Sequence, residues 1–199
     1  MGSQQVFQPL TREDKITVVL YRIGIVLSAI VMSGLAYLFV SSDAGPSGGS
    51  RSADLLACGL YAAVGMSVFF IHLYVRKFHT YLKFLYAVSV GCLAALFVIG
   101  KGSLSGALSQ VAYGPLLLLP LSGCLGFVTA KEAFCFQLNE GYLLAMIMPI
   151  YLLLVSGGML TGGGAAYGLV LIAVMLVVFT IRKVFMPIAY DIGDKSAYR

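Results

Sequence analysis

The sequence predicts an all-α membrane protein, a bundle of six transmembrane helices with both termini on the cytoplasmic side. Of its 199 residues, 60% are hydrophobic and 11% are charged, whereas a soluble domain carries about 25% charged residues. Six apolar stretches are each long enough to cross a hydrocarbon core about 30 Å thick, which takes roughly 20 helical residues. The basic residues fall almost entirely on one side of these stretches.

The first predicted span covers residues 16–40 and follows a polar segment. Thr11 and Asp14 form the pattern of a capping box, which predicts that the helix begins just before the apolar run. The run is longer than the apolar region of a signal peptide, so we expect it to remain as a membrane helix. Arg22 lies inside the run, but residues 23–40 alone extend about 27 Å at 1.5 Å per residue. Arg22 is therefore expected at the headgroup boundary, where long basic side chains reach water.

Polar, basic or glycine-rich segments separate the other five spans. Residues 41–52 read as a flexible loop rich in Gly, Ser and Pro, and residues 76–79 as a tight basic turn. Residues 131–141 read as a polar loop. The predicted spans are 53–75, 80–100, 111–130, 142–160 and 165–181. The chain is thus one transmembrane domain, 16–183, between cytoplasmic segments 1–15 and 184–199.

The placement of the basic residues predicts the orientation. With the N-terminus inside, 11 of the 13 Lys and Arg residues lie on the cytoplasmic side. Short loops are the case in which such a bias sets topology, and an odd number of spans would break the pattern. Only Arg51 and Lys101 lie outside. The cytoplasmic set is Arg12, Lys15, Arg22, Arg76, Lys77, Lys83, Lys131, Arg182, Lys183, Lys195 and Arg199.

Small residues spaced four apart predict close helix packing, the main source of association between membrane helices. Spans 53–75 and 80–100 are joined by a very short turn, so we expect them to form a packed antiparallel hairpin. Internal packing is the favoured interpretation of the small residues, and a dimer face or a sliding surface is the alternative. The positions are Gly59, Ala63 and Ser67 in the first of these spans, Ala87, Gly91 and Ala95 in the second, and Gly164 and Gly168 in the last.

Three prolines lie in the fourth and fifth predicted spans. Pro115, Pro120 and Pro149 each remove a backbone donor, so each is expected to kink its helix. Kinks are ordinary in membrane helices, because neighbours satisfy the freed carbonyls. Broken helices also line binding sites in transporters, which is the alternative interpretation.

No catalytic, metal or nucleotide motif is present, and we expect no enzymatic activity. His72 is the one candidate cofactor residue, as an axial ligand of a pigment; an interfacial histidine bonded to backbone or headgroups is the simpler interpretation. No cofactor is predicted, although chlorophyll and haem are left open. Glu132 and Glu140 read as loop residues without the histidine spacing of a di-iron site. The cysteines read as apolar filler.

The stretch Lys131-Glu132-Ala133-Phe134-Cys135-Phe136 together with the hydropathy layout resembles a family of small integral membrane proteins found chiefly in cyanobacteria and plastids. The resemblance implies a photosynthetic host, a thylakoid or plasma-membrane location with cytoplasmic or stromal termini, and no assigned activity or catalytic residues.

Two functions remain open. The first is an accessory or assembly component of a larger membrane complex, for instance a photosynthetic one, formed with other subunits or by self-association in the lipid bilayer. The alternative is a small transporter or permease that uses the proline-containing spans. A polar cavity reaching mid-bilayer would favour transport, and a filled bundle the accessory role. No nucleic-acid partner is expected. The predicted docking residues of the first function are Arg76, Lys77, Lys131, Glu132, Phe134 and Phe136.

Overall fold

The computed structural model describes residues 11–41, 51–73, 76–188 and 191, and its regular elements in these ranges are all helices. Six of them, counting η1 and α5 as one continuous span, are long and apolar enough to cross a membrane. The predicted all-α fold with six spans is confirmed. The elements are α1 (Arg12–Ser41), α2 (Arg51–Phe70), α3 (Arg76–Ile99), α4 (Leu104–Gln110), the 3₁₀ helix η1 (Gly114–Leu118), α5 (Leu119–Phe136), α6 (Asn139–Ser156) and α7 (Gly163–Val184).

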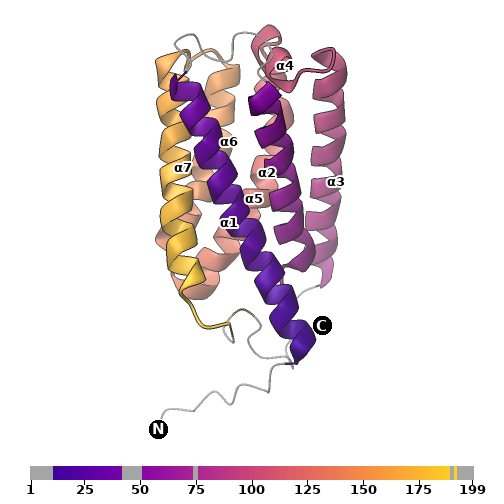
Figure 1. Ribbon diagram of the computed structural model, residues 1–199, viewed down its shortest axis with the longest axis vertical. Coiled ribbons are helices and arrows are strands. Elements are labelled where there is room, and N and C mark those ends of the chain that lie inside the picture. The colour runs from indigo at the N-terminus through magenta and orange to yellow at the C-terminus, as the bar shows by residue number, and fades with distance from the viewer. Residues whose placement is uncertain (1–10, 42–50, 74–75, 189–190, 192–199) are drawn as a thin grey trace.

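The number of spans is even, so α1 begins and α7 ends at the same end of the bundle (Figure 1). We call this the terminal end and the opposite one the distal end. Of the described basic residues, Arg51 and Lys101 lie toward the distal end and the others toward the terminal end. That the terminal end faces the cytoplasm stays a prediction.

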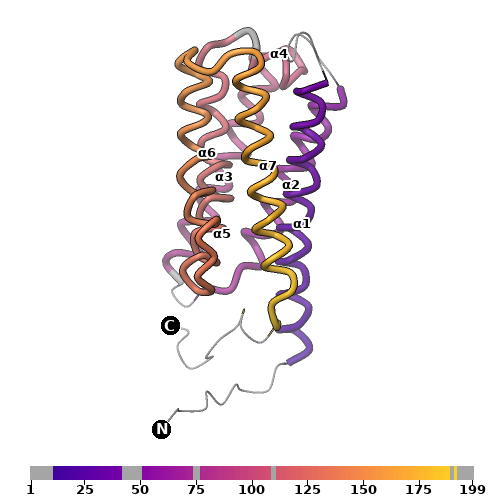
Figure 2. Tube along the Cα trace, turned by 90° about the vertical axis from the view of Figure 1, so that its left-hand side faces the viewer, coloured from indigo at the N-terminus to yellow at the C-terminus, as the bar shows by residue number. Residues whose placement is uncertain are grey.

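The bundle is built from two closely packed helix pairs, α1 with α2 and α5 with α6. Helix α7 packs against both α1 and α6, and α3 packs against α5. Figure 1 shows α1 crossing the bundle obliquely, and Figure 2 shows the α1–α2 pair on the side opposite α5 and α6. The main partner of α2 is therefore α1. Helices α2 and α3 do contact each other, and the Tyr86 hydroxyl of α3 donates to the Tyr61 carbonyl of α2 at 3.0 Å, but this predicted hairpin is packed less closely than the α1–α2 pair.

Glycine at position 24 accounts for the close approach of α1 to α2. A Cβ atom on Gly24 would lie 2.4 Å from Ser67 Oγ and 2.8 Å from the Ala63 carbonyl oxygen. The small residues of α2 thus serve internal packing, as predicted, but against α1. A Cβ atom on Gly91 of α3 would meet nothing within 4 Å, so that row of small residues does not pack internally at this point.

The capping box at the start of α1 is confirmed. The Thr11 backbone N–H donates to Asp14 Oδ2 at 2.8 Å, and the Asp14 N–H donates to Thr11 Oγ1 at 3.3 Å. These bonds satisfy two of the backbone donors that a helix start leaves open.

Two predicted boundaries differ from the structure. Helix α2 ends at Phe70 instead of residue 75, and the expected basic turn is the first turn of α3. Helix α5 continues to Phe136, through the first half of the expected polar loop, and ends where Gln137 adopts a left-handed conformation with φ of 56°. The charged residues at 131 and 132 stay helical because partners inside the bundle neutralise them, as described below.

The distal end contains a helix where the sequence predicts a loop. Ser103 caps α4 by accepting the Gly106 N–H, and Asp54 Oδ1 of α2 accepts the Ser105 N–H at 2.8 Å. Leu104 and Ala107 are buried beneath the other helices. The short helix therefore closes part of the bundle instead of crossing the membrane.

The three prolines lie in the fourth and fifth spans, as predicted, but two of them lie at the start of a helix. Pro115 lies in the first turn of η1 and Pro120 in the first turn of α5. A first-turn proline costs nothing, because its missing N–H would have no partner there, so neither kinks a helix interior. Pro149 does lie inside α6, as predicted.

Candidate functional site

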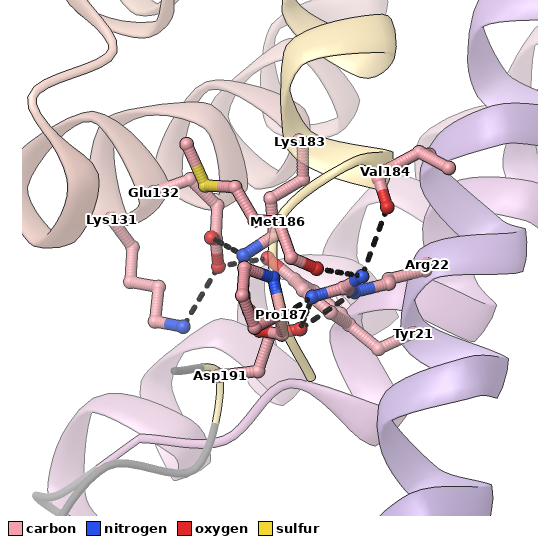
Figure 3. Close-up of polar contacts among 9 residues, drawn as sticks. All are labelled: Tyr21, Arg22, Lys131, Glu132, Lys183, Val184, Met186, Pro187 and Asp191. Carbon is pink, nitrogen blue, oxygen red and sulfur yellow. Dashed lines mark hydrogen bonds and ion pairs between the residues drawn. The ribbon is translucent and has the colours of Figure 1, made fainter. Parts of the chain in front are cut away.

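At the terminal end, three helices direct charged side chains into the bundle interior (Figure 3). We call this set the ion network. Glu132 and Lys183 are 0% exposed, and the others are nearly buried. Charges at this depth persist only when they are paired, since desolvating a lone ion costs several kcal/mol. The members are Tyr21 and Arg22 of α1, Lys131 and Glu132 of α5, Lys183 of α7, and Asp191 after α7.

Glu132 is the centre of the network. Its Oε1 accepts hydrogen bonds from the Tyr21 hydroxyl at 2.7 Å and from Lys131 Nζ at 2.8 Å. Its Oε2 forms an ion pair with Lys183. The carboxylate thus joins α1, α5 and α7 at one point.

Asp191 forms the second half of the network. Arg22 approaches Asp191 Oδ2 through Nε and Nη2, each at 2.7 Å, and Lys183 pairs with Oδ1. Lys183 is therefore shared between the two carboxylates. Its Nζ also lies 4.0 Å from the centroid of the Phe136 ring, whose negative face attracts a cation.

Arg22 also caps the end of α7. Its Nη1 donates to the carbonyls of Val184 at 3.1 Å and Met186 at 2.7 Å, and Nη2 donates to Pro187 at 3.3 Å. The last carbonyls of a helix have no partner within the helix, and a cation there is favoured by the helix dipole. The expected position of Arg22 at the headgroup boundary stays a prediction, and its guanidinium is bound by protein groups at the terminal end.

We expect Arg22→Ala to release the segment that follows α7. Each hydrogen bond to a charged group is worth about 1.5–3 kcal/mol, so amide hydrogen exchange in residues 185–188 is expected to speed up by about tenfold or more. Exchange measured by mass spectrometry in detergent checks this. Arg12→Ala, at an exposed position in the first turn of α1, is the control and leaves these rates unchanged. Unchanged rates in both variants would contradict the capping role.

His72, the predicted pigment ligand, lies in the connection between α2 and α3. Its Nε2 is 3.2 Å from Thr17 Oγ1, and the Thr17 hydroxyl donates to the Glu13 and Asp14 carbonyls. The buried Nδ1 of His72 has no hydrogen-bond partner in the described part of the chain. With one nitrogen engaged and the other enclosed, these surroundings do not fit a macrocycle.

Acidification is expected to destabilise the protein through His72. Burial, then repulsion from Lys131, lowers the pKa of His72 from 6.5, against attraction from Asp14 and Asp191. Below pH 6.5 the unfolded chain takes up a proton that the folded protein resists. Stability therefore falls as pH drops from 6.5 toward the folded pKa, by at most about 1.4 kcal/mol per pH unit. Thermal unfolding in detergent between pH 7.5 and 5.5 checks this. His72→Gln is expected to flatten the dependence, and an equal slope in both proteins would contradict it.

The predicted docking residues separate into two groups. Lys77 and Phe134 lie on the surface, with Phe134 81% exposed. Lys131 and Glu132 belong to the buried network, and Phe136 lies against Lys183, so these three do not form an open docking face. Arg76 begins α3, but its side chain lies outside the described residues. Sequence reasoning missed Tyr21, Lys183 and Asp191 as members of one site.

A cavity of about 480 Å³ occupies the distal half of the bundle, between α1, α2, α4, η1, α5, α6 and α7. It extends from Phe39 and Asp54 near the distal end down to Tyr61, Leu125 and Ile172 in the middle of their helices. Most of the lining is apolar. Its hydroxyls include Ser122 and Tyr151, which donate to the backbone carbonyls of Leu119 and Ala165, each at 2.9 Å. The hydroxyl of Tyr61, which is 4% exposed, has no hydrogen-bond partner among the described residues.

These features define a polytopic α-helical membrane protein with a charged terminal end and a hollow distal half. A family described as uncharacterized integral membrane proteins (DUF2301) matches residues 66–199, and the chain belongs to it. An uncharacterized protein of Haemophilus influenzae is 24% identical over 201 residues, covering 100% of this chain and 99% of that protein. The expected link to cyanobacteria and plastids is not shown, since this relative comes from Haemophilus. No solved structure matches the chain.

Proposed function

We propose that this protein binds one small lipophilic molecule in its distal cavity and acts as a non-catalytic carrier for it within the membrane. The cavity is the observation that supports this proposal. Its volume of about 480 Å³ lies within the range of about 300–1,000 Å³ that is typical of small-molecule sites. Protein interiors are close-packed and rarely contain voids larger than a water molecule, so a cavity of this size needs an explanation.

The lining favours a lipophilic ligand over a hydrophilic solute. The cavity is neither the polar cavity expected of a transporter nor the filled bundle expected of an accessory protein, because most of its lining is apolar. Leu60, Leu121, Leu125 and Leu152 present hydrocarbon to the space, and such surfaces do not hold ordered water. An apolar molecule gains about 25 cal/mol for each Å² that it removes from water.

The two ends of the bundle differ in a way that supports a carrier. The ion network ties α1, α5 and α7 together at the terminal end. At the distal end, the span containing α5 begins as the 3₁₀ helix η1, and α6 contains Pro149. Short 3₁₀ segments and prolines weaken the helical hydrogen-bond ladder and often mark hinges. The distal half is thus the part that can open.

Photolabelling tests whether the cavity admits an apolar molecule. The probe is a small aryl diazirine, added to the protein in detergent and mapped by peptide mass spectrometry. We expect it to label the buried cavity residues Leu121 and Leu125. Ala57→Phe fills the cavity and is expected to abolish this label, while Ala87→Phe on the exposed side of α3 preserves it. Label on the exposed Leu55 but none on Leu121 or Leu125 would overturn the proposal.

A second proposal is the accessory role in a membrane complex, for which the exposed Phe134 and Lys77 provide a surface. The membrane is then the plasma membrane or a thylakoid, with the terminal end in the cytoplasm or stroma; the distribution of basic residues supports that orientation. Native gels in mild detergent test the role, and migration solely as a monomer would contradict it.

An absorption spectrum of the purified protein tests whether His72 binds a pigment. A colourless protein would contradict pigment binding.

A further inference from the structure

Among the described residues that line the cavity, one carries a carboxylate and none carries a basic side chain. Asp54, Phe39, Tyr61 and Tyr151 all line it, and none of its described lining residues is Lys, Arg or His. We infer that the ligand is a lipophilic cation, a molecule with one ammonium or phosphonium group on an apolar body. This inference rests on the proposed function, because it names the chemical class that the same cavity takes.

Asp54 differs from the other carboxylates that pack between helices. Glu132, Glu140 and Asp191 each form an ion pair with Lys or Arg. Asp54 accepts one backbone hydrogen bond, from Ser105 N–H at 2.8 Å, and forms no ion pair within the described ranges. The carboxylate at this position therefore has no ion-pair partner among the described residues.

Two features of its surroundings interact favourably with the Asp54 carboxylate. Asp54 lies in the first turn of α2, where the helix dipole favours an anion, and the Ser105 N–H donates to the carboxylate. The apolar lining lowers the local dielectric constant, which strengthens the attraction for a cation. Phe39, Tyr61 and Tyr151 provide aromatic rings, which also attract ammonium groups.

A metal ion does not fit the same place. Calcium takes six to eight oxygen ligands, and magnesium needs near-octahedral geometry. No group of three His, Cys, Asp or Glu side chains that could hold a metal occurs in the parts of the chain that the structure describes. A single carboxylate beside aromatic rings suits a diffuse organic charge instead.

Two ions of the same shape and opposite charge provide the test. Binding of tetraphenylphosphonium and of tetraphenylborate to the purified full-length protein is measured by equilibrium dialysis in a non-ionic detergent. We expect saturable binding of the phosphonium with one site per chain, and binding of the borate that is weaker by about tenfold or more, since a half-buried carboxylate without an ion-pair partner repels an anion. Equal affinities for the two ions would overturn the inference.

The variant that tests the residue is Asp54→Asn. Asparagine keeps an oxygen to accept the Ser105 N–H, so α4 retains its contact with α2. We expect the affinity for tetraphenylphosphonium to fall by about tenfold or more. Glu140→Gln removes a carboxylate that lies outside the cavity and leaves the affinity unchanged. Equal effects of the two variants, or none, would overturn the inference.

The outcomes separate this inference from the proposed function. If the diazirine labels Leu121 and Leu125 but neither ion binds, the cavity stands and the cation class fails. If neither the label nor the ions enter, both fail. An ammonium group can also belong to a lipid headgroup. Native mass spectrometry of protein extracted with phosphatidylethanolamine distinguishes the source: a lipid retained by wild type and lost in Asp54→Asn identifies a headgroup, and binding of the phosphonium alone identifies a free cation.

Discussion

Glu132→Gln is expected to lower the free energy of unfolding by about 3–5 kcal/mol, the cost of breaking a buried ion pair by removing one partner. The variant leaves Arg22, Lys131 and Lys183 in the interior with Asp191 as the one remaining carboxylate of the network. Glutamine still accepts the Tyr21 hydrogen bond, so the loss reflects charge and not shape. Unfolding in mixed micelles with increasing sodium dodecyl sulfate measures it.

Glu140→Gln is the matched control, because Glu140 pairs with Arg182, which is 53% exposed. Exposed pairs contribute about 0–1 kcal/mol, so this variant is expected to stay close to wild type. Similar losses in the two variants would contradict the assignment of Glu132 as the centre of a buried network.

The charge count also predicts an order of effects. Lys183→Met leaves two cations facing two carboxylates, and is therefore expected to cost less than Glu132→Gln. The double variant restores the wild-type excess of one positive charge and should recover part of the loss. A double variant that loses the sum of the two single effects would show that the charges do not interact.

Gly24→Leu is expected to lower the free energy of unfolding by about 3 kcal/mol, the upper end of the usual range for overpacking. This is the second of the two largest effects. The Cβ atom alone would lie 2.8 Å from the Ala63 carbonyl oxygen and from the Ser67 backbone nitrogen. Backbone atoms of a packed helix cannot rotate away, so α1 and α2 must separate. The same micelle titration measures the change.

Gly91→Leu on α3 is the control, because no atom lies within 4 Å of its Cβ position. Leucine is a better helix former than glycine by up to about 1 kcal/mol, so this variant is expected to be neutral or more stable. A loss as large as that of Gly24→Leu would mean that α3 has a packing partner on this side.

The six spans were predictable because hydropathy is a local property of about 20 consecutive residues. The capping box at Thr11 and Asp14 was predictable for the same reason. The true end of the fourth span, which lies beyond residue 131, was not predictable. A Lys-Glu pair reads as the point where the chain meets water, unless its partners are known. Those partners, Tyr21 and Lys183, lie far away in the sequence, and only the packing of α1, α5 and α7 brings them together.

The cavity and the α1–α2 contact could not be predicted from the sequence for a related reason. Helix periodicity shows which residues share a face, but not which neighbouring helix that face meets. The small residues predicted to pack between helices do not include Gly24, although Gly24 allows α1 to approach α2 closely. A void depends on the side chains of several elements failing to fill a space between them, and no single segment encodes that. The carboxylate of Asp54 indicates a ligand class only once the apolar and aromatic lining around it is known.

The hydrogen bonds and the ion pair that join Arg22 to residues at and beyond the end of α7 have a consequence for biogenesis. Arg22 lies in the first span to be synthesised. Its partners Val184, Met186 and Asp191 leave the ribosome only after the first five spans have been synthesised. Until then the Arg22 guanidinium has none of these partners. Assembly of the terminal end is therefore a late event, and chains cut short after residue 184 cannot form the contacts of Arg22 with Met186, Pro187 and Asp191.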